Sequence, residues 1–195
     1  MHPKTPLWAK LIYTLVMALV LPYYWVNYGP VNFLWFSDIS FFLMGVALWL
    51  ESPLIASMMA VGVFPLEILW LLDFASFGVL GGITDYMHDQ SLPLYLRALS
   101  SFHFFIPPAI IYMILKYGYD RRAFLYQLVL VWCVVPLTYY FADPAVDNIN
   151  WVFGIGGQQT LMSPDVYVAL YMVVFPLVVM VPMHLLLKRY FARAR

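Results

Sequence analysis

LPLYLRALSSFHFFIPPAIIYMILK, residues 92–116, decides the fold class of this chain. About 20 apolar residues in a helix cross the roughly 30 Å of a bilayer's hydrocarbon, and this stretch is long enough. It nevertheless contains Arg97 and His103. An ionisable group inside a membrane costs free energy unless it faces other helices and is paired there. The stretch therefore predicts a membrane-spanning helix with a polar side turned toward the rest of the protein.

The whole chain has the composition of a membrane protein. Of its 195 residues, 64% are hydrophobic and only 10% are charged, and the mean hydropathy is +0.83. Soluble domains carry about a quarter of charged residues. The net charge is zero, so nothing in the charge pattern suggests nucleic-acid binding. The single cysteine, Cys133, excludes an internal disulfide and a cysteine-based metal site.

Apolar windows predict an all-α polytopic protein, a bundle of six transmembrane helices in one domain, residues 1–195. The first apolar run is followed by aromatic residues and has no small-residue cleavage site, so we expect a retained span and no secretory signal. The expected spans are 7–26, 32–50, 53–75, 93–117, 123–142 and 165–188.

Basic residues gather on one side of this predicted topology. Cytoplasmic loops are enriched in Lys and Arg, so both termini are expected in the cytoplasm. We expect the chain to lie in a cell membrane such as the bacterial inner membrane. Nine of the ten basic residues fall on that side: Lys4, Lys10, Lys116, Arg121, Arg122, Lys188, Arg189, Arg193 and Arg195. Arg97 is the exception.

Five ionisable residues on three consecutive spans share the outer half of the predicted membrane. A helix rises about 1.5 Å per residue, which places Glu67 and His103 at similar depths. We expect this pair to share a proton and Arg97 to bind Asp38 or Asp73 bidentately. The alternative is that the cluster only holds helices together. Its members are Asp38, Glu67, Asp73, Arg97 and His103.

The outer loops add further polar groups. The first interpretation of FADPAVDNINWVFGIGGQQ, residues 141–159, is a set of Asx-type turns anchored at the membrane interface by Trp151. The alternative is a lid over the cluster, with Asp143, Asn148, Asn150 and Trp151 as candidate substrate contacts. The segment 83–90 offers Asp85, His88 and Asp89 as metal-ligand candidates. No HExxH motif or His pair at i+4 accompanies them, so the sequence predicts no metal site. It identifies no cofactor either.

Two stretches resemble a known family. LPLYLRALSSFHFFIPPAIIYMI (92–114) and NINWVFGIGGQQTLMSPDVYVALYMVVFPL (148–177) are similar to a span and to the last loop and span of the YwaF-like bacterial integral membrane family. Eukaryotic relatives of that family are lipid acyltransferases that use a Cys and a His. The resemblance implies shared architecture. The family's Cys position corresponds to Arg97, so the covalent nucleophile is not carried over, and His103 has no clear counterpart.

Three functions fit these patterns. The first is an enzyme that modifies a membrane lipid or another amphiphile, in which His103 is the general base, Glu67 orients it, and Arg97 binds an anionic headgroup or stabilises an oxyanion. Asp38 and Asp73 would complete that site. The second is an accessory or assembly subunit that docks on membrane-protein partners. The third is a small proton-coupled transporter.

Overall fold

A computed structural model describes residues 4–192 and is all-helical. Within these residues no strand forms, and only an isolated bridge joins Tyr119 to Ala192. The α-helices are α1 (Leu7–Tyr28), α2 (Phe36–Leu50), α3 (Pro53–Gly62), α4 (Phe64–Ala75), α5 (Asp85–His88), α6 (Leu94–Leu99), α7 (Ile106–Tyr117), α8 (Ala123–Phe141), α9 (Pro164–Phe175) and α10 (Val181–Phe191). Shorter pieces are the 3₁₀ helices η1 (Pro30–Leu34), η2 (Ser100–Phe104) and η3 (Ile149–Trp151) and the π-helix η4 (Pro176–Met180).

Four helical stretches within residues 4–192 are long and apolar enough to cross a membrane. They are Leu7–Tyr28, Leu94–Tyr117, Ala123–Phe141 and Pro164–Phe191. The pair α3–α4 makes a fifth if it is counted as one span, but it is bent by 55°. The expected span at 32–50 is a regular α-helix only from Phe36, and its 15 residues extend about 22 Å. The fold therefore fits a multi-pass membrane protein.

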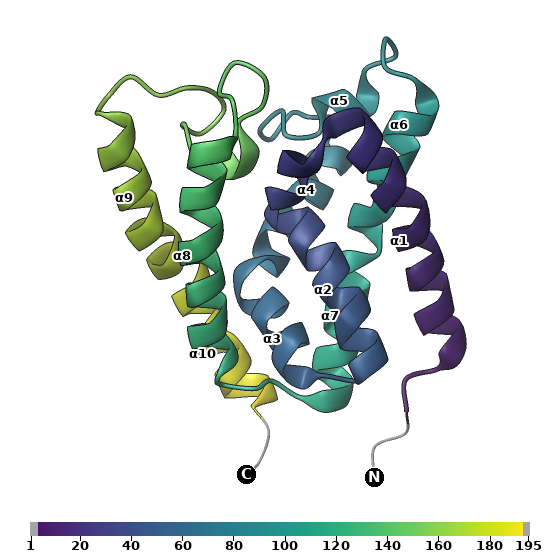
Figure 1. Ribbon diagram of the computed structural model, residues 1–195. Helices are drawn as coiled ribbons and strands as arrows, with labels where there is room; N and C mark the ends of the chain where they lie inside the picture. The colour runs from purple at the N-terminus through teal and green to yellow at the C-terminus, as the bar shows by residue number, and fades with distance from the viewer. Residues whose placement is uncertain (1–3, 193–195) are drawn as a thin grey trace.

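Helix α3 is the centre of the bundle. It packs against α2, α7, α8 and α10, while α1 lies outside α2 and the α8–α10 group occupies the opposite flank (Figure 1). Small residues allow this close approach: Ala56 and Ala60 are fully buried, and a Cβ on Gly62 would collide with the Gln127 amide of α8. Large apolar side chains instead cover the outside of the long helices, as expected where the solvent is lipid.

Prolines explain where the helices break. A proline has no N–H and cannot bond the carbonyl four residues earlier. Pro65 therefore leaves the Val61 carbonyl without its helical donor, and α3 gives way to α4 at Val63. Pro182 likewise cannot donate to the Val178 carbonyl, and the helix is a π-helix, η4, at this point.

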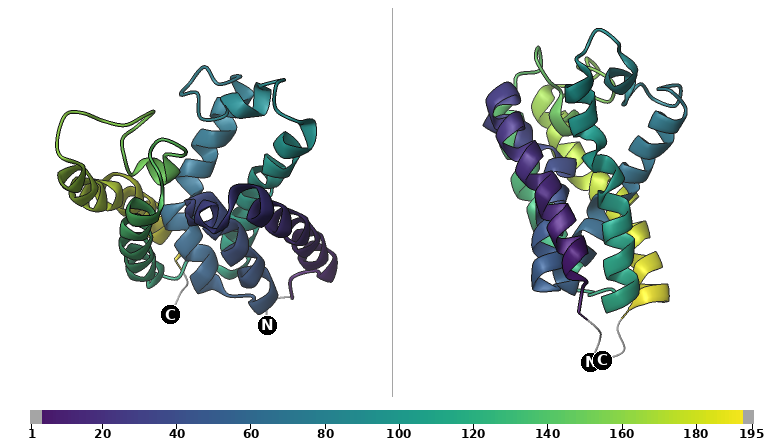
Figure 2. Two further views of the ribbon diagram at one scale, coloured as in Figure 1. Left: turned by 45° about the horizontal axis from the view of Figure 1, so that its top comes forward. Right: turned by 90° about the vertical axis from the view of Figure 1, so that its right-hand side faces the viewer.

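The two ends of the bundle differ in charge. The long helices run side by side between them (Figures 1 and 2). One end, the basic end, holds the start of α1, the turns at 51–52 and 118–122, and the end of α10. The Tyr119 N–H in the second of these turns donates to the Phe191 carbonyl at the end of α10. Its basic residues within the described chain are Lys4, Lys10, Lys116, Arg121, Arg122, Lys188 and Arg189; Arg193 and Arg195 lie outside that part. The opposite, acidic end holds the loops 76–84 and 142–163 and Arg97.

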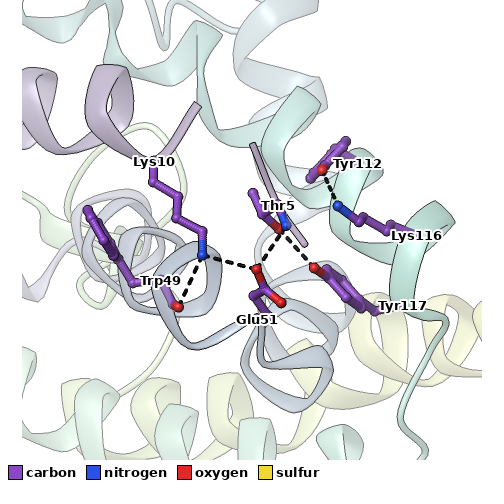
Figure 3. Close-up of polar contacts among 7 residues, drawn as sticks. All are labelled: Thr5, Lys10, Trp49, Glu51, Tyr112, Lys116 and Tyr117. Carbon is purple, nitrogen blue, oxygen red and sulfur yellow. Dashed lines mark hydrogen bonds and ion pairs between the residues drawn. The ribbon is translucent and has the colours of Figure 1, made fainter. Parts of the chain in front are cut away.

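A polar network ties the chain together at the basic end (Figure 3). The Glu51 carboxylate accepts hydrogen bonds from the Lys10 ammonium at 3.0 Å and from the Thr5 N–H at 2.8 Å. The Thr5 hydroxyl lies 2.9 Å from the Tyr117 hydroxyl at the end of α7. These bonds, the Lys10 ammonium first, hold the pKa of Glu51 below its ordinary value. The network fastens α1 to the α2–α3 turn and to α7.

Replacement of Glu51 by Gln is expected to lower Tm by a few degrees at pH 7, because the anchor of α1 is weakened. A carboxyl whose pKa is lower in the folded state stabilises above its unfolded pKa, and that stability is lost as the pH falls through the folded value. The Tm difference between wild type and Glu51→Gln should therefore shrink below about pH 4. Thermal unfolding in detergent from pH 3 to 8 measures it. Asp143→Asn, an exposed change at the acidic end, is the control; a Glu51→Gln deficit independent of pH would contradict the account.

Candidate functional site

A carboxylate–imidazole pair lies inside the bundle toward the acidic end. Glu67 Oε2 of α4 is 2.8 Å from His103 Nδ1 of η2. The Glu67 side chain is 2% exposed and that of His103 is 9% exposed. In the sequence, α4 and η2 are separated by a long loop region and by the short helices α5 and α6. The contact between them confirms the expectation that Glu67 and His103 meet.

Two prolines give His103 its local conformation. Pro107 and Pro108 cannot donate to the carbonyls of His103 and Phe104, so the helix is 3₁₀ over Ser100–Phe104 and returns to α at Ile106. A 3₁₀ helix has three residues per turn, so Ser100 and His103 lie above one another on the same side. This side faces the bundle, since both residues are buried.

Aromatic rings hold the His103 imidazole in place. It stacks on Trp70 at a centroid distance of 4.2 Å and an interplanar angle of 8°, and on Phe102 at 4.4 Å and 22°. Trp70 lies one helical turn after Glu67 on α4, so a single helix face supplies both the hydrogen-bond partner and the stacking partner. The ring plane and the bonded nitrogen are therefore both fixed.

Asp38 lies close to this pair, on the first turn of α2. It is 2% exposed, and its Oδ1 atom has no hydrogen-bond partner within the described chain. Phe41, one helical turn after Asp38, stacks on Phe102, the neighbour of His103, at a centroid distance of 4.8 Å. The structure thus brings together three of the five predicted cluster residues: Asp38, Glu67 and His103.

Arg97 does not form the expected pair with Asp38 or Asp73. Its Nη1 donates to the Met87 carbonyl at 3.2 Å, and its Nε atom is buried without a partner within residues 4–192. The Arg97 charge instead bears on Asp89, an exposed loop residue. Bonds to Ser91, and then the Arg97 charge, lower the pKa of Asp89. The half-buried guanidinium is consequently not neutralised by a buried carboxylate.

Asp73 is held by its own loop and does not pair with Arg97. Its carboxylate accepts hydrogen bonds from the Gly81 N–H at 2.8 Å, the Thr84 N–H at 2.8 Å and the Thr84 hydroxyl at 2.7 Å. These three donors all belong to the loop that follows α4. Asp73 was matched to Arg97 by depth alone, but the loop folds back over the end of its own helix and satisfies the carboxylate first.

The loop 142–163 is fastened by the residues expected to contact substrate. The Asn150 side chain accepts from the Phe36 N–H at 2.9 Å and donates to the Leu34 carbonyl at 2.7 Å, which joins the loop to the start of α2. Asn148 bonds the Gly154 carbonyl and the Phe153 N–H within the loop.

The other two lid candidates have local roles. Asp143 is exposed and caps its own turn by accepting from the Ala145 N–H, and the Trp151 carbonyl accepts from the Tyr167 hydroxyl. None of these interactions involves Glu67 or His103. The loop is therefore an anchored cover at the acidic end of the bundle.

The metal-ligand candidates lie apart from the pair. His88 stacks between Phe74 and Phe77, each at a centroid distance of 5.0 Å, and Asp85 packs over Gly78 in the preceding turn. Within residues 4–192, no three His, Cys, Asp or Glu side chains converge as ligands of one ion.

An apolar groove lies away from the polar cluster. It measures about 210 Å³ and runs between α3–α4, α7 and α10, toward the basic end. Its lining includes Ala60, Ile114 and Leu187 and contains no polar side chain. Hydrocarbon fits such a surface, and no proton-transfer chemistry is available there.

The geometry defines what the pair can do chemically. When Glu67 is ionised, it accepts the Nδ1 proton of His103, and Nε2 then carries the lone pair of the neutral imidazole. An acid that orients one imidazole nitrogen and leaves the other free to accept a proton is the arrangement of a general base. Burial strengthens the interaction, since the bundle interior has a low dielectric constant.

Several site residues were missed in the sequence. Trp70 could have been found, because it follows Glu67 at the spacing of one helical turn. Tyr24 on α1, whose hydroxyl lies 2.9 Å from that of Ser100, gave no signal, since its approach to the cluster depends on how distant helices pack.

Comparison with models of protein families, with characterised proteins and with solved structures finds no match. The resemblance to the YwaF-like family and the partner-subunit and transporter hypotheses therefore stay predictions.

Proposed function

We propose that the chain crosses a bacterial inner membrane six times with both termini in the cytoplasm. The acidic end, with the Glu67–His103 pair beneath it, then belongs to the outer leaflet. The charge difference between the two ends supports this orientation. The short helix α2 follows η1 across the non-helical Trp35, and in this proposal the two together make the second crossing.

Labelling of single cysteines tests the orientation. In a Cys133→Ala background, Gln90→Cys at the acidic end is expected to react with an impermeant maleimide added to intact spheroplasts. Arg121→Cys at the basic end is expected to react only after permeabilisation. The opposite labelling pattern, or equal labelling of both, would refute the orientation.

Within this frame, the protein is an enzyme that modifies a membrane lipid or a similar amphiphile at the outer leaflet. The observation that carries the proposal is the 2.8 Å contact between Glu67 Oε2 and His103 Nδ1, with a second buried acid, Asp38, on the first turn of α2. A catalytic pair needs a fixed geometry, and the Trp70 and Phe102 rings supply it. His103 acts as general base through Nε2, and Glu67 positions it.

Arg97 provides the contact to the headgroup in this proposal. It is the single basic residue at the acidic end within residues 4–192, and no buried acid neutralises it. A guanidinium binds phosphate or carboxylate oxygens through paired hydrogen bonds, so an anionic headgroup is the group it fits. It lies at the start of the same helical stretch as His103.

Purified protein in vesicles of phosphatidylethanolamine and phosphatidylglycerol tests the reaction, with lipid products resolved by mass spectrometry. Wild type is expected to form a product, and His103→Ala to form it at least about 100-fold more slowly, the scale of general-base catalysis. Glu67→Gln keeps the hydrogen-bonding shape and should lose less.

The control is His184→Ala at the basic end, where His184 bonds Tyr119. It should keep wild-type turnover. Equal turnover by His103→Ala and wild type, with both variants folded, would refute the enzyme proposal.

A further inference from the structure

The loop between α4 and α5, residues 76–84, exposes apolar side chains at the acidic end. Its sequence, SFGVLGGIT, contains no charged residue. Phe77 is 77% exposed, Val79 is 83% exposed and Leu80 is 67% exposed. We call these three side chains the apolar tip. Exposed apolar side chains that lie together mark a surface that contacts a membrane or another protein. The apolar tip is therefore a candidate interaction surface.

The polar backbone of this loop is bonded inside the protein. The Asp73 carboxylate at the end of α4 accepts hydrogen bonds from the Gly81 and Thr84 N–H groups, each at 2.8 Å. Other N–H groups of the loop donate to carbonyls of α4 or of the loop itself, and these donors are Ser76, Phe77, Gly78, Val79 and Gly82. A backbone N–H that is already paired loses little when it leaves water. The loop can therefore enter a less polar surrounding at a low cost.

The turn holds Phe77 at the surface. Phe77 has a φ of 57°, a left-handed conformation that bulky residues rarely adopt, and Gly78 continues the turn with a φ of 81°. The Phe77 ring contacts the His88 ring at a centroid distance of 5.0 Å, yet most of its surface stays exposed. The local backbone is thus strained in a way that keeps a large apolar side chain outside the bundle.

The apolar tip continues the outward side of α4. Leu69 and Leu72 are each 51% exposed, whereas Glu67 and Trp70 of the same helix are buried in the bundle. Helix α4 is bent by 55° from α3, and the right-hand view of Figure 2 shows it leaning outward, with the loop at the periphery of the acidic end. The exposed apolar side of a membrane-spanning segment contacts lipid. The surface that leads into the loop is therefore suited to lipid.

Exposed aromatic residues on other helices mark the same end of the bundle. Trp and Tyr concentrate where hydrocarbon meets headgroups. Trp25 and Tyr28 lie at the end of α1, Tyr95 lies in the first turn of α6, and Tyr140 lies at the end of α8. In Figure 1 the loop lies level with the acidic-end tips of α1 and α8. The loop thus lies at the depth where these aromatic residues place the membrane surface.

We propose that the loop 76–84 inserts the apolar tip into the boundary between lipid headgroups and acyl chains at the acidic end. The partner is a lipid surface, because the tip carries no charge, continues the lipid-facing side of α4 and lies level with the exposed aromatic residues. Insertion fastens the end of α4, the helix that carries Glu67 and Trp70, to the membrane. This contact requires neither the proposed orientation of the chain nor the proposed reaction, so it stands or fails separately from both.

Collision measurements on a nitroxide label test the insertion. Leu80→Cys is labelled in a Cys133→Ala background, and single copies are placed in nanodiscs of phosphatidylethanolamine and phosphatidylglycerol. Oxygen concentrates in lipid and a nickel chelate stays in water, so the ratio of their collision rates with the nitroxide reports its surroundings. The ratio at Leu80→Cys is expected to be at least about threefold higher than at Gln90→Cys, since an inserted tip lies below the headgroups.

Gln90→Cys is the matched control in water, because Gln90 is exposed in the next loop of the same end. Leu72→Cys on α4 is the control in lipid, and its ratio should resemble that of Leu80→Cys. Equal ratios at Leu80→Cys and Gln90→Cys would place the tip in water and overturn the proposal. Low collision rates with both reagents would mean that protein covers the tip and would overturn it as well. If Leu80→Cys disturbs the loop, judged by its Tm, Val79→Cys decides by the same criteria.

Discussion

The hydrogen bond between Glu67 and His103 is the interaction on which the acidic half of this protein depends. Two ionisable groups inside an apolar bundle are unfavourable unless they satisfy each other. The pair joins α4 to η2, and Trp70 and Phe102 pack around it, so the same contact fixes helix positions and the orientation of an imidazole. A pair of this kind can hold two helices together and can also orient an imidazole for proton transfer.

Helix breaks place the pair. Pro65 lets α4 turn away from α3 just before Glu67, and Pro107 and Pro108 convert the segment before them to a 3₁₀ helix that presents Ser100 and His103 together. The small residues of α3 keep the centre closely packed beneath the site, while the basic end is held by the separate Glu51 network. The centre of the bundle is thus built by close packing, and each of its two ends is held by a separate set of hydrogen bonds.

The sequence predicted the structure correctly where a residue's surroundings depend on its own segment of the chain. Hydropathy predicted the helical stretches, and the spacing of basic residues predicted which turns share an end. Helical depth brought Glu67 and His103 together correctly. Depth failed for Arg97 and Asp73, because it carries no information on the direction in which a side chain points or on a loop that folds back, as residues 81–84 do over Asp73. Asn150 was read as a lid residue, yet its amide fastens the loop to α2, a contact across 114 positions that no local pattern encodes.

The coupling of Glu67 and His103 is the most direct test of this account. A double-mutant cycle compares the free energies of unfolding of wild type, Glu67→Gln, His103→Gln and the double variant in detergent. If the two side chains form one buried unit, the double variant should be less destabilised than the sum of the single variants, by about 1 kcal/mol or more. Single effects that add to within about 0.3 kcal/mol would mean that the two residues do not interact and would contradict the account.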